Sequence, residues 1–154
     1  MGKSLFLTVI YAVCSLCYMA AQGLVNVKHY SVKDGMSQNT VQGVLQDNEG
    51  YIWMATWNGL EKFDGYSFKN YKTYPTDKVK LQYNRLVNLQ LGGNQMLVCQ
   101  SYDRRVYLFD IRRECFEDVF VYHPEVKLCT AASKIITLPN GMVWIVGTNG
   151  DLWR

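Results

Sequence analysis

Residues 41–64 have the sequence VQGVLQDNEGYIWMATWNGLEKFD, and this stretch decides the fold. Apolar runs at 41–46, 51–56 and 60–64 are separated by breaks at 47–50 and 57–59, which carry Asp, Asn and Gly. Short runs rich in Val, Ile, Trp, Tyr and Phe, bounded by such residues, predict strands joined by hairpins. The stretch therefore predicts a small antiparallel meander. Because so few strands are only marginally stable alone, it needs copies of itself to pack against.

The same plan recurs twice further along the chain. Trp53 and Trp144 lie 91 residues apart, and Val98 lies between them at offsets of 45 and 46. A repeat of about 45 residues with four short strands is typical of a β-propeller blade. The predicted fold is all-β, a partial β-propeller of about two and a half to three four-stranded blades. Strands are predicted at residues 41–46, 51–56, 60–64 and 67–71, then 85–91, 95–102, 106–111 and 115–122, then 134–138, 142–148 and 152–153.

The first and third units share the pattern W-x-x-x-T-x-N-G-x-L. We expect Trp53 and Trp144 to pack as blade core, because mid-strand residues with a period of two point alternately into the core. The Asn-Gly pairs predict type I′ hairpin turns, which need positive φ angles. In the second unit Val98 replaces the tryptophan, and Asp103-Arg104 replaces Asn-Gly. Four residues are expected to shape turns: Asp47, Gly50, Gly59 and Gly150.

Composition excludes several classes of function. The chain has 154 residues, 49% of them hydrophobic, with 16 Lys and Arg against 13 Asp and Glu. These values indicate a globular protein, and no basic cluster suggests a nucleic-acid partner. His29 and His123 have no Cys or carboxylate at metal-ligand spacing, so we expect neither a metal nor a cofactor. The serines and carboxylates form no catalytic constellation, so we do not expect an enzyme.

Residues 1–22 have the pattern of a secretory signal peptide. Lys3 precedes an uncharged apolar run at 5–19, and Ala20 and Ala21 supply small residues near a cleavage site. An uncleaved membrane anchor is the alternative, but the run is short for a membrane-spanning helix. We therefore expect an exported, periplasmic protein whose mature part, 23–154, is the incomplete propeller, with blade repeats at about 41–72, 85–122 and 134–154.

The mature part keeps Cys99, Cys115 and Cys129. An odd number of cysteines argues against a complete disulfide framework. Cys99 lies in an apolar strand, where a free cysteine acts as a small buried hydrophobe.

Residues 29–71, HYSVKDGMSQNTV…LQDNEGYIWMATWNGLEKFDGYSFKNY, resemble the opening of the two-component regulator propellers. The resemblance is specific here, fair over 134–153 and weak in the middle unit. It implies the exported sensor region of a hybrid histidine kinase, in which a signal peptide, blades, a β-sandwich linker, a membrane helix and kinase modules follow in order. In that family the blades bind ligand, often a glycan fragment, and kinase catalysis belongs to segments absent here.

Two classes of function remain open from the sequence. The first is a ligand-sensing module of a two-component receptor, present as an N-terminal fragment without its kinase. The alternative is a fragment of an exported propeller enzyme, of the glycan lyase or quinoprotein type, or an inactive truncated product. The expected partners are an oligosaccharide and further blades or receptor modules, with membrane contact only through downstream segments. Loops on a rigid scaffold carry recognition, so the candidate ligand-binding residues are Trp57, Asn58, Tyr102, Asp103 and Arg104.

Blade arithmetic leads to a further expectation. Without the first 22 residues, 132 remain, which is just under three repeats, whereas closed propellers have about four to eight blades. Residues 26–31 would form the outer strand that completes the last blade of a closed ring. An open flank would expose apolar surface and unpaired strand edges, so we expect the isolated mature chain to aggregate or unfold in part.

The signal-peptide prediction is tested by the intact mass of protein recovered from the cell envelope. We expect a species that begins near residues 20–23, because the small residues there suit the signal peptidase. Recovery of the chain with Met1 still attached would contradict cleavage.

Overall fold

The structure is a computed structural model that describes residues 2, 3, 6, 11, 26–77, 79, 81–93, 95–117 and 131–154. Eleven strands of this part form three antiparallel sheets, preceded by the 3-10 helix η1 (Val32–Asp34). The first sheet holds β1 (Val41–Gln46), β2 (Ile52–Thr56), β3 (Gly59–Phe63) and β4 (Phe68–Tyr71). The second holds β5 (Leu86–Leu91), β6 (Met96–Ser101), β7 (Val106–Asp110) and β8 (Cys115–Glu117). The third holds β9 (Ala132–Thr137), β10 (Val143–Gly147) and β11 (Leu152–Trp153).

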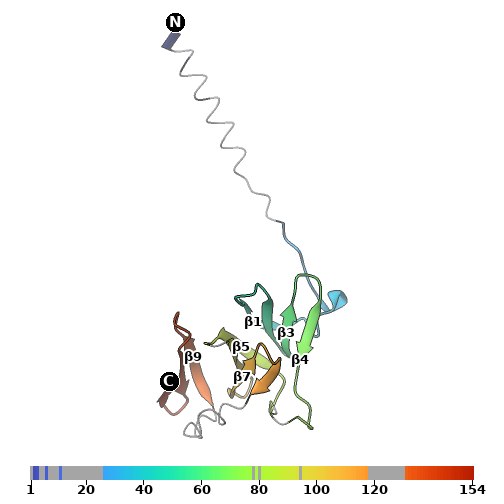
Figure 1. Cartoon of the computed structure of the whole chain (residues 1–154), viewed down its shortest axis with the longest axis vertical. Coiled ribbons are helices and arrows are strands. Elements are labelled where there is room, and N and C mark those ends of the chain that lie inside the picture. The colour runs from blue at the N-terminus through green and yellow to red at the C-terminus, as the bar shows by residue number, and fades with distance from the viewer. Residues whose placement is uncertain are drawn as a thin grey trace.

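The three sheets follow one another side by side (Figure 1). Strand β5 contacts β1 and β2 on one side and β9 on the other, so the first strands of successive sheets are neighbours. Each sheet then runs outward in chain order, which is the arrangement of blades in a propeller. The all-β, partial propeller prediction is confirmed. Predicted strand ends agree within two residues, except that residues 118–122 of the eighth predicted strand lie outside the described residues.

The repeat is present in the backbone as well as in the sequence. The first strand of every sheet has a β-bulge against its neighbour, with Gln42, Val87 and Ser133 as the extra residues. These positions are 45 and 46 residues apart, the same offsets that relate Trp53, Val98 and Trp144. A bulge bends a strand and increases its twist. The three sheets therefore share a curvature that the sequence analysis did not predict.

The hairpins between the second and third strands differ from the predicted type. Gly59, Arg104 and Gly150 have φ angles of 107°, 66° and 93°, but Asn58 is not among the residues with positive φ. In the second and third sheets the N–H of Arg104 or Gly150 donates to the carbonyl three residues earlier, at 2.9 and 3.2 Å. This is a type I turn followed by one left-handed residue, so the type I′ prediction is wrong. A single left-handed position explains why Asp103-Arg104 can stand where the other units have Asn-Gly.

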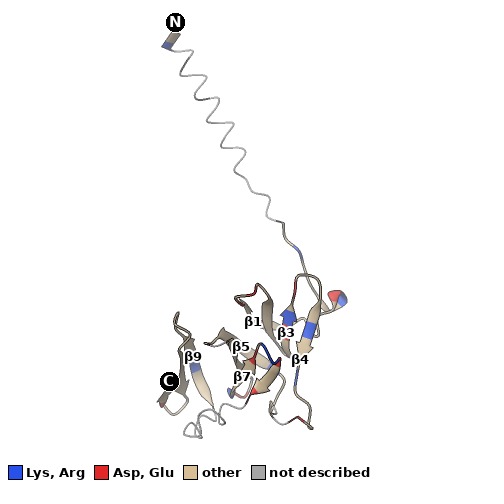
Figure 2. Cartoon of the chain, in the orientation of Figure 1, with Lys and Arg blue, Asp and Glu red and all other residues tan. Residues whose placement is uncertain are grey.

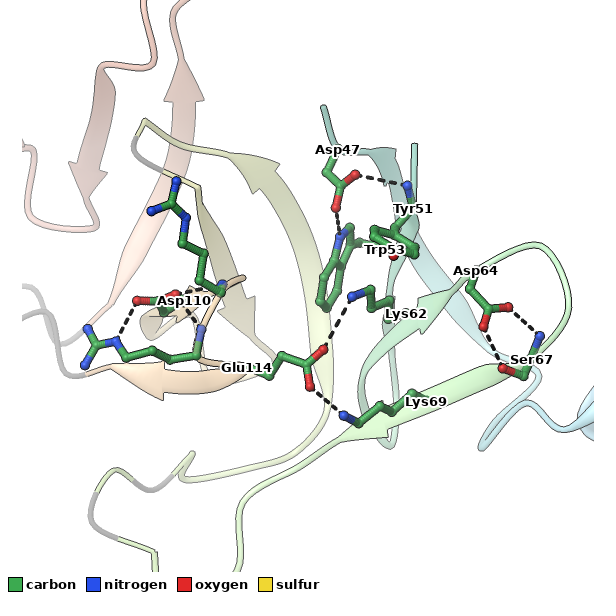
Figure 3. Close-up of polar contacts among 11 residues, drawn as sticks. Asp47, Tyr51, Trp53, Lys62, Asp64, Ser67, Lys69, Asp110 and Glu114 are labelled. Carbon is green, nitrogen blue, oxygen red and sulfur yellow. Dashed lines mark hydrogen bonds and ion pairs between the residues drawn. The ribbon is translucent and has the colours of Figure 1, made fainter. Parts of the chain in front are cut away.

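Trp53 is the centre of the core between the first and second sheets. It is fully buried, and its ring centroid lies 5.4 Å from that of Phe109 and 5.7 Å from that of Tyr71. Its indole N–H donates to Asp47 Oδ2 at 2.7 Å (Figure 3).

Cys99 is also fully buried in this core, and burial raises the pKa of its thiol. Cys99 and Cys115 are both free thiols, and Cys129 lies outside the described residues.

Trp144 occupies the equivalent place in the third sheet but is only half-buried. Val143 and Ile145 pack on a cluster formed by Val98 of the second sheet and by Ala132 and Ile135 of their own sheet, so they face the second sheet. Because side chains alternate along a strand, Trp144 points to the opposite face. No sheet of the described residues covers that face. Within this part of the chain, Trp144 is therefore not packed between two sheets as Trp53 is.

Residues 26–31 are not in a strand, and since the described residues contain no last blade for them to complete, that expectation stays a prediction. Ser31 and Asp34 make a capping box that starts η1, which favours a helical turn over an extended strand. The Tyr30 ring packs on Phe63 and Phe68, at centroid distances of 4.8 and 5.6 Å. The segment thus covers the outer strands of the first sheet, on the face that points away from the second sheet.

The turn geometry predicts opposite effects of glycine at equivalent positions. Arg104→Gly removes the strain of a left-handed arginine, and after the entropy cost of glycine we expect a gain of about 0.5–1 kcal/mol in unfolding free energy. Gly150→Ala introduces that strain without a clash, because an added Cβ meets nothing within 4 Å, and should cost about 1 kcal/mol. Gly59→Ala should cost more, because its Cβ would collide with the carbonyl oxygen of Tyr71. Urea unfolding followed by tryptophan fluorescence measures all three, and a destabilising Arg104→Gly would contradict the turn assignment.

Candidate functional site

The candidate site lies on the edge formed by the hairpins β2–β3 and β6–β7. Trp57 and Tyr102 are the first residues of these two turns, and 42% and 63% of their surfaces are exposed. Their backbone N–H groups donate to the carbonyls of Thr40 and Arg85, at 3.3 and 2.9 Å. Each exposed ring is therefore fixed to the residue just before the first strand of its own blade. We call Trp57, Arg85 and Tyr102 the turn-edge cluster.

Arg85 brings the two predicted loops together. Its guanidinium carbon lies 3.6 Å from the centroid of the Trp57 ring and 4.8 Å from that of Tyr102. Cation–π contacts at these distances are favourable, because the ring faces are electron-rich. Sequence reasoning missed Arg85, since it is 28 residues from Trp57 and 17 from Tyr102 and belongs to no motif. Only the side-by-side packing of the sheets places it between the two turns.

The other predicted site residues divide into two groups. Asn58 and Asp103 serve the turns themselves: the carbonyl of Asn58 accepts from Asn70 Nδ2 at 3.0 Å, and Asp103 accepts from the Ser101 hydroxyl. Asp103 also pairs with Arg105, at 3.2 Å between Nε and Oδ2. Arg104 is exposed, and only its backbone is engaged, with its carbonyl accepting from Ala132 N at 2.7 Å. Among the described residues, the side chains of Arg104 and Asn58 make no hydrogen bond or ion pair, so both remain available to a ligand together with those of the turn-edge cluster.

An ion-pair cluster fastens the first two blades together at their outer strands (Figure 3). Glu114, in the turn between β7 and β8, pairs with Lys69 of β4 and with Lys62 of β3, the latter at 3.4 Å. The hydrogen bond from Lys69 is the main cause that holds the pKa of Glu114 at about 2, with smaller contributions from Tyr71 and Lys62, while burial acts in the opposite direction. Lys62 also lies 3.9 Å above the centroid of the Tyr51 ring. This clamp helps to fix Trp57 of one blade relative to Arg85 of the next.

A cavity of about 380 Å³ lies at the opposite edge, where the first hairpins of the three sheets meet. Its lining includes Asp47 and Glu49 of the first sheet, Gly93 of the second and Gly141 of the third. The Asp47 carboxylate already accepts bonds from the backbone N–H groups of Glu49 and Tyr51 and from the Trp53 indole. The oxygens of Asp47 therefore stabilise the hairpin and the core. This makes the cavity a weaker candidate for a ligand-binding site than the turn-edge cluster.

The described part of the chain shows neither a metal-binding cluster nor a membrane-spanning helix. Within it, no group of three or more His, Cys, Asp or Glu side chains is placed to hold a metal ion. No helix formed by those same residues has the length and apolar character needed to cross a bilayer. His123 lies outside the described residues.

Comparisons with known proteins found one related sequence and several structures with a similar fold. The chain matches no family model. Histidine kinase P4 of Formosa agariphila is 32% identical over 76 residues, which are 49% of this chain and 6% of that protein. The extracellular domain of a hybrid two-component system of B. thetaiotaomicron has a TM-score of 0.63 at 20% identity, with 82% of this chain and 20% of that chain covered.

A second extracellular domain of B. thetaiotaomicron, described as part of a one-component system, has a TM-score of 0.56 at 23% identity and covers 77% of this chain and 16% of that chain. Another structure, described as part of a hybrid two-component system, has a TM-score of 0.53 at 22% identity.

The resemblance to the two-component regulator propellers is confirmed. The solved relatives are extracellular domains, and none is a catalytic domain. The chain spans only a small part of each: 6% of the curated relative and 16–20% of the three solved extracellular domains.

The Glu114 clamp predicts a pH-dependent contribution to stability. The pKa of this carboxyl falls from 4.5 to about 2 on folding, so its contribution is present above about pH 4.5 and is lost as the pH falls toward 2. Because its side chain is 31% exposed, solvent screening limits the contribution to about 1 kcal/mol. Glu114→Gln should lower the unfolding free energy by that amount at pH 7 and have little effect near pH 2. Glu49→Gln, at an exposed carboxylate without an ion pair in the described residues, is the control, and equal losses for both variants would contradict the clamp.

Proposed function

We propose that this chain is part of the exported, periplasmic sensor region of a two-component signalling receptor. The support is the propeller fold shared with extracellular domains of such systems, together with the partial identity to a histidine kinase. In this proposal the kinase, the membrane helix and further blades belong to other segments of a longer receptor. The chain then contributes to ligand recognition and performs no catalysis.

The observation that carries the proposal is the turn-edge cluster. Two aromatic rings are exposed on adjacent turns, with a guanidinium between the loops that bear them. Aromatic faces pack against the apolar C–H faces of sugars, while cationic and amide groups bond to hydroxyls. The cluster therefore suits a polar ligand with apolar faces, and an oligosaccharide has both properties.

Because this edge is open, we expect the chain alone to bind an oligosaccharide weakly. Ligand sites usually enclose most of their ligand in a concave pocket, whereas these side chains stand on exposed hairpins. A strong site would thus need walls from neighbouring blades. We expect the turn edge to supply part of a binding surface that other blades complete.

The alternative proposal is a fragment of an exported propeller enzyme. Such enzymes need acids, bases or metal ligands that converge on one face. Among the described residues the carboxylates of the turns, such as Asp47, Asp103 and Asp110, are engaged in turn hydrogen bonds or ion pairs. No observation favours the enzyme over the sensor.

Aromatic truncations separate recognition from folding. In the receptor that contains this chain, Trp57→Ala and Tyr102→Ala should weaken oligosaccharide binding at least fivefold, because the packing of a sugar C–H face on an aromatic ring is lost, and should change thermal stability little. Trp53→Ala should instead cost about 3–5 kcal/mol of stability, as a buried aromatic truncation. Tyr66→Ala is the matched control, since Tyr66 is 95% exposed on the β3–β4 turn at the other edge.

Calorimetry with an oligosaccharide selected on a glycan array measures the affinities. Wild-type binding by both turn variants would refute the assignment of the ligand to this edge, and the propeller fold would stand.

A further inference from the structure

The guanidinium of Arg85 has aromatic neighbours but no anionic one. It forms no ion pair with any acidic side chain among the described residues, whereas the neighbouring Arg105 pairs with Asp103. Nor does any side chain in that part of the chain accept a hydrogen bond from it. The guanidinium is half-buried, and its N–H donors are not used by any acceptor in that part of the chain, so they remain available to a ligand.

The ring contacts determine which donors are left. A guanidinium that stacks on an aromatic ring uses its planar face, and its N–H groups lie in the plane and stay available. Five N–H groups arranged as a fork match the two oxygens of a carboxylate or the oxygens of a sulfate. Such charge-assisted bonds are roughly twice as strong as bonds to a neutral hydroxyl.

The distribution of charge over the two edges also favours an anionic ligand at the turn edge. The turn edge carries Arg85, Arg104 and Arg105 against Asp103 and Asp151. At the opposite edge, the hairpins β1–β2, β3–β4 and β7–β8 carry mostly carboxylates, and acidic residues mark the β1–β2 turn (Figure 2). An anionic ligand is therefore attracted to the turn edge and repelled from the other.

We propose that the turn-edge cluster recognises an acidic sugar, with Arg85 binding its carboxylate or sulfate group while the rings of Trp57 and Tyr102 pack against the sugar. This inference rests on the proposed sensor function and narrows its ligand to anionic glycans. Arg104, exposed on the same turn as Tyr102 and without an ion pair in the described residues, adds charge at the rim of the site.

The test uses charged oligosaccharides and their neutral counterparts as probes. These are tri-galacturonate with its trimethyl ester, which differ in the carboxylates alone, and a sulfated tetrasaccharide of heparin with its desulfated, esterified form, which differ in both sulfates and carboxylates. Calorimetry at physiological ionic strength on the receptor region that contains this chain compares the two members of each pair. At least one charged probe should bind at least tenfold more tightly than its neutral counterpart, and a preference in the galacturonate pair would identify the carboxylate.

Variants then assign the preference to Arg85. Arg85→Met keeps the apolar stem between the rings but removes the fork, and should reduce the preference at least fivefold. Arg85→Lys keeps the charge and should retain only part of the preference, because an ammonium cannot bind two oxygens in one plane. Arg112→Met is the matched control, since it removes an exposed arginine at the other edge, and should leave the preference unchanged.

The outcomes separate this inference from the proposed function. Equal affinity for charged and neutral probes, with binding still lost in Trp57→Ala, overturns the acidic-sugar inference and leaves the sensor proposal standing. A charge preference that Arg85→Met leaves intact overturns the assignment to Arg85. If none of the four probes binds, the acidic-sugar inference is overturned, and the glycan array then decides the sensor proposal on its own.

Discussion

The packing of Trp53 between the first two sheets is the contact on which the rest of the structure depends. Its indole fills the space between the blades, against Phe109 and Tyr71, and its N–H fixes the Asp47 hairpin. Since the two sheets cannot slide without opening this core, the turns at their edge hold a constant relation to each other. The turn-edge cluster exists because of that constraint: Trp57 belongs to one blade, and Arg85 and Tyr102 belong to the next.

The second unit shows how a blade keeps its backbone when its sequence drifts. Three described residues other than glycine have positive φ angles, Gln95, Arg104 and Glu114, and all three lie in hairpins of this unit. Gln95 and Arg104 stand where the flanking units have glycine. Each costs strain that glycine would avoid, yet two of them have another use: Glu114 joins the lysine clamp, and Arg104 adds charge beside Tyr102. The turns whose residues depart from the repeat are therefore the one that contacts the first sheet, through Glu114, and the one that faces solvent near the proposed site, through Arg104.

Much of this fold could be predicted from the sequence, because strand periodicity and turn residues are local signals. The strands around Trp53 and the 45-residue period are confirmed within narrow limits. The shared bulges could not be predicted, since one extra residue leaves the apolar pattern almost unchanged. The Asn-Gly turns were assigned to the wrong type because the sequence shows that a left-handed residue is needed, but not how many. Of the site, the exposed rings of Trp57 and Tyr102 were predicted from their place in turns. Arg85 was missed because its role comes entirely from contacts between residues distant in sequence.

The central claim is that the packing of neighbouring blades builds a recognition edge from the second hairpins and the residues just before the first strands. Hydrogen–deuterium exchange in the presence of a bound oligosaccharide tests it most directly, because it locates the ligand on the backbone without any substitution. The account predicts slower exchange at residues 56–59, 84–86 and 101–105 and no change at 47–50 and 92–95. Protection confined to residues 47–50 and 92–95, around the cavity at the opposite edge, would contradict it.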